Sequence, residues 1–538
     1  MMKVKGSGWA VGLLLVVVLV AFSGLEKSFY QQDEWMALGN AIALKKDYFL
    51  SRNENLISVL LGQGRVLSGT LVYFVLRVWP LKIAPFVFMA VGLHTVVVVF
   101  VFFLVKWLFR DYWAAVLAAV FFALNSVSAG AVTWPAASVG ILIATLLIIG
   151  ACTFFYNGGK DGRWLAFGLL YLSLYFKEIG NYLFFVLPVS ILLMERGGMV
   201  KHIKNYWMYY VFGLLYFGSW WWELKSIPVQ QDLFLTGYTN NFMLTAGVRA
   251  VLYPLTSVSL VLVPSSLALW WAKQLARWYY PFLVGPSFDL VSQTVVLDML
   301  ALALTVILAF LAYWVLKVMR RDARNLVAAI LALGFTSYWS YVVISKSYSY
   351  LEGRYYYLGA IATTVLVGAV ISVRRSWPRL SWVIVGLTLL LIGLHFRALR
   401  LEIGRLRKDG EIRRAIVSQI DTQLPEINER QAVYLKGDRN YYIEKGNPLP
   451  LQQGTGYTLM VLYSLRGYDL GDLIKERFLW DLGSQGYREV AGRGFGYFWD
   501  WEKLEEEISK GQVGVEDVVC LYYDSVANKL RRDECKNE

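Results

Sequence analysis

The feature that most constrains this chain is a series of uninterrupted apolar runs, most of them about 17–25 residues long. A helix needs about 20 consecutive apolar residues to cross the hydrocarbon core of a bilayer. Hydrophobic residues make up 57% of the 538 residues and charged residues only 17%, which is too little charge for the surface of a soluble protein of this length. The sequence therefore predicts an all-α polytopic membrane protein.

The apolar runs predict about eleven transmembrane spans. The first follows Lys3 and Lys5 and extends from about Gly8 to Gly24; we expect a retained anchor rather than a cleaved signal peptide. The other spans are expected at about residues 84–105, 112–126, 139–156, 164–178, 181–194, 206–224, 295–316, 325–344, 355–373 and 380–396.

Two regions between the spans are expected to hold helices that do not cross. In a first outer loop, residues 25–82, a short apolar piece near Val66–Trp79 is typical of a helix lying in the membrane interface. In a large outer loop, residues 225–294, the apolar segment 250–272 is interrupted by prolines. We therefore assign that segment to re-entrant or interfacial helices.

The placement of positive charge predicts the orientation. The net charge is +13, and lysines and arginines collect in short loops between alternate spans, as they do in cytoplasmic loops. These residues are Lys106, Arg110, Lys160, Arg163, Arg196, Lys201, Lys204, Lys317, Arg320, Arg321, Arg324, Arg374, Arg375 and Arg379. We expect a multi-pass protein of a prokaryotic plasma membrane, with its N-terminus in the cytoplasm and its C-terminus outside. No basic stripe with interleaved aromatics is present, which argues against a nucleic-acid partner.

The composition changes after about His395, where charged residues and glycines replace the apolar runs. A helix is expected at about 398–424 and another at Trp499–Ser509, with strands at Gln431–Lys436 and Val518–Tyr523. The sequence thus predicts a transmembrane domain over residues 1–396 and a small extracytoplasmic α/β domain over residues 397–538.

The three cysteines predict neither a metal site nor a definite disulfide. Cys152 lies in an apolar run, where a small buried side chain is the simplest interpretation. Cys520 and Cys535 could pair if the C-terminal region is extracytoplasmic, but their spacing is no metal motif and gives little reason to predict a structural disulfide.

Two pairs of ionisable residues lie next to predicted spans. Asp33 and Glu34 follow the first span on the expected outer face, where a carboxylate can act as a general base; a solvated acidic pair is the simpler alternative. Lys177 and Glu178 end an apolar run. Ionisable groups at membrane depth are usually functional, although an interfacial pair extending to the headgroups would give the same pattern.

A third group precedes the tenth span. Arg354, Tyr355, Tyr357 and Lys346 could bind a lipid phosphate through charge-assisted hydrogen bonds; the alternative is an aromatic belt with one arginine. Arg65 and His94 are weaker candidates. His94 lies within an apolar run, where a hydrogen-bonded packing residue would look the same.

Taken in order, these segments resemble the GT-C glycosyltransferases, in particular the protein O-mannosyltransferases of the branch with tetratricopeptide repeats. The resemblance covers roughly residues 8–373. The segments are QQDEW (Gln31–Trp35), FMAVGLHTVVVV (Phe88–Val99), FFALNSVSAGAVTW (Phe121–Trp134), LSLYFKEIG (Leu172–Gly180) and EGRYYYLGA (Glu352–Ala360).

The resemblance implies an inverting glycosyltransferase that moves a sugar, mannose among the candidates, from a polyprenyl-phosphate carrier to an acceptor hydroxyl on a protein, glycan or lipid. It assigns the catalytic base to Asp33 with support from Glu34. It also implies that Arg354, Tyr355 and Tyr357 meet the donor phosphate, and the family's Lys-Glu pair corresponds to Lys177 and Glu178.

The chain departs from the family pattern in several places. Where relatives carry His-Pro and then an acidic residue, it has Asn125-Ser126 and Gly130; Ser138 replaces an arginine, and Gly353 separates Glu352 from Arg354. The second outer loop thus lacks acidic residues, so neither a metal nor another cofactor is expected. The tetratricopeptide repeats are absent, and the C-terminal domain follows instead.

Two other classes of function compete with a transferase. A transporter or flippase of lipid-linked saccharides would show internal repeats and helices broken at mid-membrane by Gly or Pro, and we find no repeat. A non-enzymatic membrane scaffold that presents the C-terminal domain is the third interpretation.

Overall fold

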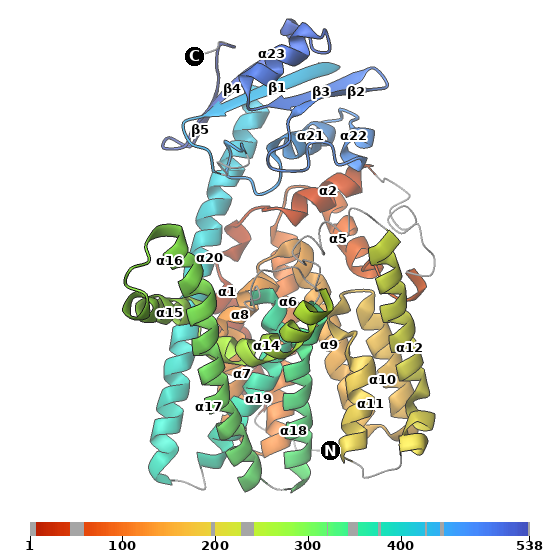
Figure 1. Ribbon diagram of the computed structural model, residues 1–538, viewed down its shortest axis with the longest axis vertical. Helices are drawn as coiled ribbons and strands as arrows, with labels where there is room; N and C mark the ends of the chain where they lie inside the picture. Colours follow the sequence, from red (N-terminus) through yellow and green to blue (C-terminus); the bar gives the residue numbers. More distant parts are fainter. Residues whose placement is uncertain are drawn as a thin grey trace. The chain divides into compact units, whose positions relative to one another are not determined.

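The computed structural model describes residues 7–43, 59–194, 199–226, 242–319, 321–342, 353–374, 378–424, 428–441 and 446–535. The chain divides into two compact units (Figure 1). Unit 1 comprises Met1–Ser23, Asn55–Ser68 and Phe88–Ile403. Unit 2 comprises Gly24–Glu54, Gly69–Val87 and Gly404–Glu538.

Unit 1 is a bundle of helices. Its elements are α1 (Ser7–Phe22), most of α6 (Ala84–Phe109), α7 (Tyr112–Leu124), α8 (Ser126–Val132), α9 (Pro135–Asn157), α10 (Gly159–Leu174), η2 (Glu178–Gly180), α11 (Leu183–Met194), α12 (Met199–Ser226), α14 (Phe242–Leu262), α15 (Ser265–Tyr279), α16 (Gly285–Val291), η3 (Ser292–Val296), α17 (Leu297–Val318), α18 (Arg321–Thr336), η4 (Ser337–Tyr341), η5 (Gly353–Tyr356), α19 (Tyr357–Val373) and the first part of α20 (Pro378–Gln423). In Figure 1, α17 and α18 meet at the same end of this bundle at which α20 begins. The helical membrane architecture predicted from the sequence is confirmed.

The expected number of about eleven spans is wrong. In the described part of the chain, six helices are long and apolar enough to cross a membrane, or up to eight if each of two bent helix pairs is one span. Of the other expected spans, α10 and α18 have 16 residues each and α11 has 12, which is short of the roughly 20 that the hydrocarbon core requires. α12 is longer, but three lysines and many Tyr and Trp residues lower its hydropathy. Apolar runs in the sequence overestimated the number because they do not reveal helix length.

The apolar segment 250–272 forms α14 and α15, which meet at a bend of 109°. The second bent pair is α7 and α8, at 55°. Side chains satisfy the backbone groups that these breaks expose. Asn125 accepts a hydrogen bond from Val127 N at 3.0 Å and donates one to Val261 O at 2.9 Å, and His395 bonds to Ser126 N at 3.1 Å and Leu262 O at 2.9 Å. The breaks are thus held by specific polar contacts, as helix ends require.

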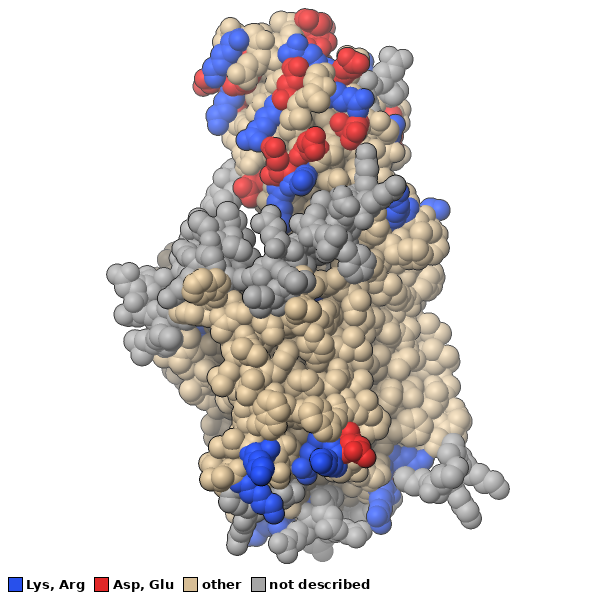
Figure 2. Space-filling model, turned by 90° about the vertical axis from the view of Figure 1, so that its right-hand side faces the viewer, with Lys and Arg blue, Asp and Glu red and all other residues tan. Residues whose placement is uncertain are grey.

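The sides of the helices in unit 1 carry few charges. Figure 2 shows them as a broad uncharged surface, with Lys and Arg side chains gathered near one end of the bundle. Unit 1 exposes large apolar side chains, among them Phe88, Leu214 and Phe310. In water such a surface would drive association, whereas in a bilayer it is the surface that contacts lipid.

Unit 2 contains the predicted α/β domain together with most of the segment that follows α1. Its elements are η1 (Leu25–Lys27), α2 (Asp33–Ala43), most of α5 (Val66–Val78), the second part of α20, β1 (Arg430–Gly437), α21 (Thr455–Leu465), α22 (Gly471–Lys475), β2 (Gly486–Val490), β3 (Arg493–Phe498), α23 (Trp501–Ser509), η8 (Val515–Asp517), β4 (Val518–Asp524) and β5 (Lys529–Arg532). α5 is the helix expected near Val66–Trp79. The expected domain boundary at residue 396 lies within α20, which continues unbroken to Gln423.

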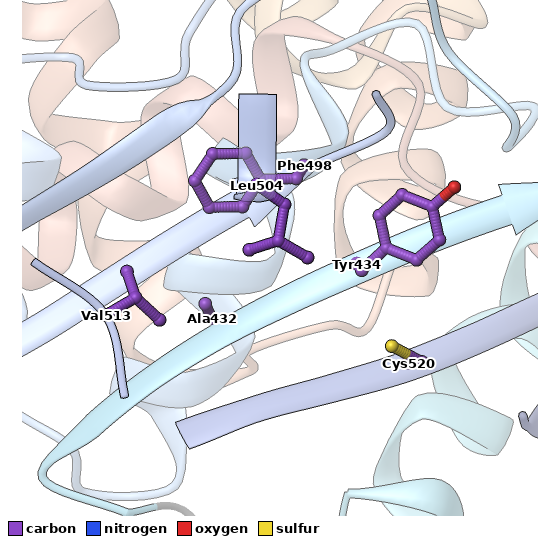
Figure 3. Close-up of a cluster of buried hydrophobic side chains, with 6 residues drawn as sticks. All are labelled: Ala432, Tyr434, Phe498, Leu504, Val513 and Cys520. Atoms are coloured by element: carbon purple, nitrogen blue, oxygen red, sulfur yellow. The ribbon is translucent and has the colours of Figure 1, made fainter. Parts of the chain in front are cut away.

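The sheet of unit 2 has five strands in the order β2-β3-β1-β4-β5. The central strand β1 pairs in parallel with β3 and β4, and the two edge strands are antiparallel to their neighbours. Figure 3 shows the core between the sheet and α23, formed by Ala432, Tyr434, Phe498, Leu504, Val513 and Cys520. The predicted small α/β domain is confirmed, with β1 and β4 at the expected positions.

One covalent link was not predicted from the cysteine spacing. Cys520 in β4 forms a disulfide with Cys535, while Cys152 in unit 1 is a free thiol. The residues between the two half-cystines comprise the end of β4, a turn and β5, which pairs antiparallel with β4. The hairpin brings the two sulfurs together, and this pairing is a property of the fold rather than of the spacing.

Candidate active site

Several of the predicted site residues meet in unit 1. We call Arg65, Lys177, Glu178, Arg354 and Tyr355 the cationic cluster. Arg65 Nε donates to Glu178 Oε2 at 2.7 Å, and its Nη2 bonds the other carboxylate oxygen. Lys177 Nζ lies 3.6 Å from Glu178 Oε1. The charges of Arg65 and Arg354 both act on Lys177, so residues far apart in the sequence share one electrostatic environment.

The turn that precedes α5 positions Arg65. Its backbone is left-handed, with φ 55°, a conformation that costs about 1–3 kcal/mol in a non-glycine residue and is most often kept at functional sites. After this turn, Leu67 N and Ser68 N donate to Tyr175 O at 3.1 and 3.3 Å. The turn is thereby fixed to the end of α10, two residues before Lys177.

Lys177 lies between α10 and η2, outside every candidate span. It is buried, with 8% of its surface exposed. Burial and the guanidinium of Arg65 lower the pKa of Lys177 to about 7, with a smaller contribution from Arg354, although the Glu178 carboxylate acts in the opposite direction. The lysine can therefore gain or lose a proton near neutral pH, which an ordinary surface lysine does not.

Arg354 is held by aromatic side chains. Its guanidinium lies 4.4 Å from the ring centroid of Trp134 and 5.0 Å from that of Tyr355, and its Nη2 donates to the Tyr355 hydroxyl at 3.2 Å. The Tyr355 ring in turn packs on Tyr341 of η4, with centroids 4.4 Å apart. These contacts keep a planar cation in one orientation.

The chemistry of the cluster is that of an anion site. Arg65 and Lys177 lie against the carboxylate of Glu178, and the charge of Arg354 also acts on Lys177, so three cationic side chains share this region. Guanidinium groups bind phosphate and carboxylate oxygens through two parallel hydrogen bonds, and an ammonium adds a point charge. A phosphate group with several free oxygens is the ligand that this combination fits.

An apolar cavity of about 490 Å³ lies among α6, α9, α11, α18 and α19 of the same unit. Its lining includes Phe103, Cys152, Leu326, Gly334 and Leu358. Leu358 of α19 follows Arg354 of η5 by four residues, so these two consecutive helices connect the lining of the cavity to the cationic cluster. The cavity has room for part of a hydrocarbon chain.

His94 and Tyr357 form a separate, fully buried pair. His94 Nδ1 lies 2.7 Å from the Tyr357 hydroxyl, and Nε2 faces Ala123 O at 3.4 Å. Since Nε2 must donate to that carbonyl, Nδ1 accepts from the tyrosine. The rings of Phe22 and Phe122 pack around His94. Its contacts are those of a hydrogen-bonded packing residue, and Tyr357 directs its hydroxyl to His94.

Asp33 and Glu34 belong to unit 2, where they begin α2. Glu34 is buried and accepts hydrogen bonds from Gln31 N at 2.9 Å and Gln32 N at 3.3 Å. It therefore holds the loop before the helix. Asp33 is partly exposed, which leaves it the better candidate for chemistry. That Asp33 and Arg354 act on one substrate stays a prediction.

Two contacts of the site were missed in the sequence. Trp134 lies in one of the segments that carry the family resemblance. Tyr341 lies near the end of the span expected at residues 325–344. No role in the site was predicted for either residue. Nothing in a single sequence indicates which aromatic residue will stack on a given arginine.

Lys346 and Glu352 lie outside the described residues. Within the described ranges, no group of three or more His, Cys, Asp or Glu residues is placed to hold a metal.

No family model matches the chain, and no curated protein matches it.

Proposed function

We propose that this protein is a membrane glycosyltransferase that moves a sugar from a polyprenyl-phosphate carrier to an acceptor hydroxyl, with inversion at the anomeric carbon. The observation that carries the proposal is the cationic cluster formed by Arg354 and Tyr355 of η5 with Arg65, Lys177 and Glu178. Arg354, Arg65 and Lys177 would hold the donor phosphate there and stabilise the charge that it acquires as a leaving group.

The apolar cavity supports a lipid-linked donor. A polyprenyl chain needs apolar walls, and the cavity lies among helices of the bundle that can lie within the bilayer. The combination of a phosphate site and a chain site reached along one helix fits an amphiphile better than a soluble nucleotide sugar.

The reaction needs a base but no acid. Asp33 would take the proton of the acceptor hydroxyl as its oxygen forms a bond with the anomeric carbon. The bond between that carbon and the phosphate oxygen breaks on the opposite face, and the electron pair leaves with the phosphate. The products are the glycosylated acceptor and polyprenyl phosphate. The proposal requires Asp33 to reach the donor that Arg354 holds.

The extracytoplasmic location of unit 2 forms part of the proposal. A disulfide persists in oxidising compartments and is rare in the cytosol, and Cys520 and Cys535 form one. The basic loop between α17 and α18 is predicted to lie in the cytoplasm, on the side of the membrane opposite to the predicted location of unit 2. Polyprenyl-phosphate sugars would then be used on the outer face.

The test is donor consumption by the purified protein in bilayers. With polyprenyl-phosphate mannose or glucose and a hydroxyl acceptor, polyprenyl phosphate should be released, and Asp33→Asn should abolish the release. Asp161→Asn is the matched control, because Asp161 also lies in the first turn of a helix. Arg354→Ala should raise the donor KM, whereas Arg531→Ala, which removes an arginine stacked on Tyr522, should not. Full activity of Asp33→Asn would exclude this base.

A flippase of lipid-linked saccharides is the second candidate, and the two bent helix pairs favour it. Broken helices that meet are common in transporters, and Asn125 and His395 join the two breaks here. A flippase would move a fluorescent lipid-linked sugar between leaflets without consuming it. A protein that neither consumes nor moves the lipid would be a scaffold.

A further inference from the structure

The helix α15 carries a large aromatic surface that faces away from the bundle. Trp270 and Trp278 are 55% and 73% exposed, and Phe282 in the following turn is 74% exposed. We call this the α15 surface; its members are Trp270, Trp271, Trp278, Tyr279 and Phe282. Three small residues on the other side of the helix are buried, namely Ala268, Ala272 and Ala276. α15 packs on η3 and α17. The buried alanines form the packed side of the helix, because small side chains let two backbones approach closely.

The length of the helical stretch next to α15 indicates the depth at which the α15 surface lies in a membrane. α16, η3 and α17 form one helical stretch of 34 residues, Gly285–Val318. At about 1.5 Å per residue, η3 lies roughly 33–39 Å from Val318. The hydrocarbon core is about 30 Å thick, and the bilayer with headgroups is about 40–45 Å thick. If the basic residues near Val318 lie at one membrane surface, η3 lies in the headgroup layer of the opposite leaflet.

The chemistry of α15 fits that layer. Tryptophan and tyrosine are enriched where hydrocarbon meets headgroups. Lys273 and Arg277 are four residues apart and therefore share one side of the helix, where cations can meet lipid phosphates. Lys273 also forms an ion pair with Asp289 of α16 at 2.8 Å, which fastens α15 to the end of the long helical stretch.

The structure leads us to infer that the α15 surface binds the lipid headgroup layer of the leaflet opposite to Val318, as an in-plane membrane anchor. The bend of 109° after α14 turns α15 out of the direction of α14, and the exposed apolar side chains of α17, among them Ile307 and Phe310, continue toward the hydrocarbon core. This inference does not depend on the proposed activity.

Spin labels in bilayers would test the anchor. In a Cys152→Ser background, where the remaining two cysteines form the disulfide, Trp278→Cys and Phe282→Cys would each be labelled in the full chain. Phe310→Cys on α17 gives the hydrocarbon reference, and Val526→Cys, at a residue 92% exposed in unit 2, gives the aqueous reference. Accessibility to oxygen and to a water-soluble nickel chelate reports the depth of each label.

Labels at residues 278 and 282 should be accessible to both reagents. Their ratio of oxygen accessibility to nickel-chelate accessibility should lie between the ratios measured for Phe310→Cys and Val526→Cys. A ratio equal to that of Val526→Cys would show that the surface lies in water and would overturn the inference. Dipolar broadening between labels on two chains would show that a second copy covers the surface, which would also overturn it.

Discussion

Gly130 of α8 lies directly against the backbone of Arg354, so that a Cβ atom at residue 130 would be only 2.7 Å from Arg354 N. The acidic residue expected at this position from the family resemblance would have no space in this packing. The close packing of Arg354 on residue 130 therefore requires a glycine there and excludes a carboxylate side chain. Trp134, in the turn after α8, completes it by stacking on the guanidinium at 4.4 Å.

Gly130→Ala should displace η5 and weaken binding of the donor phosphate. Overpacking of this kind typically costs about 1–3 kcal/mol, and the higher helix propensity of alanine returns only about 1 kcal/mol. Unfolding in detergent and binding of a polyprenyl phosphate measure the two effects. Gly168→Ala in α10 is the control, because its Cβ would meet no atom within 4 Å. Equal behaviour of the two variants would show that the contact with Arg354 is unimportant.

The stability of the protein should depend on pH through Lys177. Its pKa is about 7 in the folded protein and about 10.5 in an ordinary lysine, so the unfolded chain binds more protons between these values. The unfolding free energy of the wild type should therefore rise relative to Lys177→Met as the pH rises from 7 to 10, by up to about 1.4 kcal/mol per pH unit. The difference should level off below pH 7, where both states are protonated.

Denaturation of both proteins at several pH values between 6 and 10 provides the measurement. A difference that does not change with pH would mean that Lys177 keeps its usual pKa. A bound phosphate should favour the ammonium form, so its affinity should fall as the pH rises above 7.

The disulfide should stabilise unit 2. Closing a loop of about 15 residues is worth roughly 3 kcal/mol in the chain-entropy description, and the loop here has a sequence separation of 15. Cys535→Ser should therefore lower the stability of unit 2 by about 2–3 kcal/mol. In the unreduced, denatured wild type, a maleimide should label Cys152 alone, and three labelled cysteines would show that the bond is absent.

The sequence allowed the class of fold to be predicted, because apolar runs and the charged C-terminal region follow directly from composition. β1 and β4 were also predictable as short runs at Gln431–Lys436 and Val518–Tyr523, although β1 is buried on both sides from Gln431 to Leu435 rather than on the one side that alternation implies. The number of transmembrane spans could not be predicted, because the positions at which α10, α11 and α18 end depend on tertiary contacts. The assignment of Asp33 to unit 2 likewise results from packing of α2 against α21 and α22.

For the candidate site, the sequence indicated the charged residues but not their contacts. Lys177 and Glu178 were identified because ionisable groups at membrane depth are costly, and Arg354 because an arginine beside tyrosine hydroxyls can bind a lipid phosphate. Arg65 was a weak candidate, and only the fold shows that it bonds Glu178. His94 remained ambiguous, because a histidine in an apolar run has the same appearance whether it packs or reacts.

Filling the apolar cavity should discriminate between donors by chain length. Cys152 lines the cavity, and Cys152→Phe would place a ring where we expect the polyprenyl chain. The apparent KM for a long-chain donor should rise severalfold, while a donor with a short chain, which reaches only the cationic cluster, should be used as before. Cys152→Ser, which keeps the side-chain volume, should change neither value. An equal effect of Cys152→Phe on both donors would mean that the chain lies elsewhere and that the ring merely disturbs the bundle.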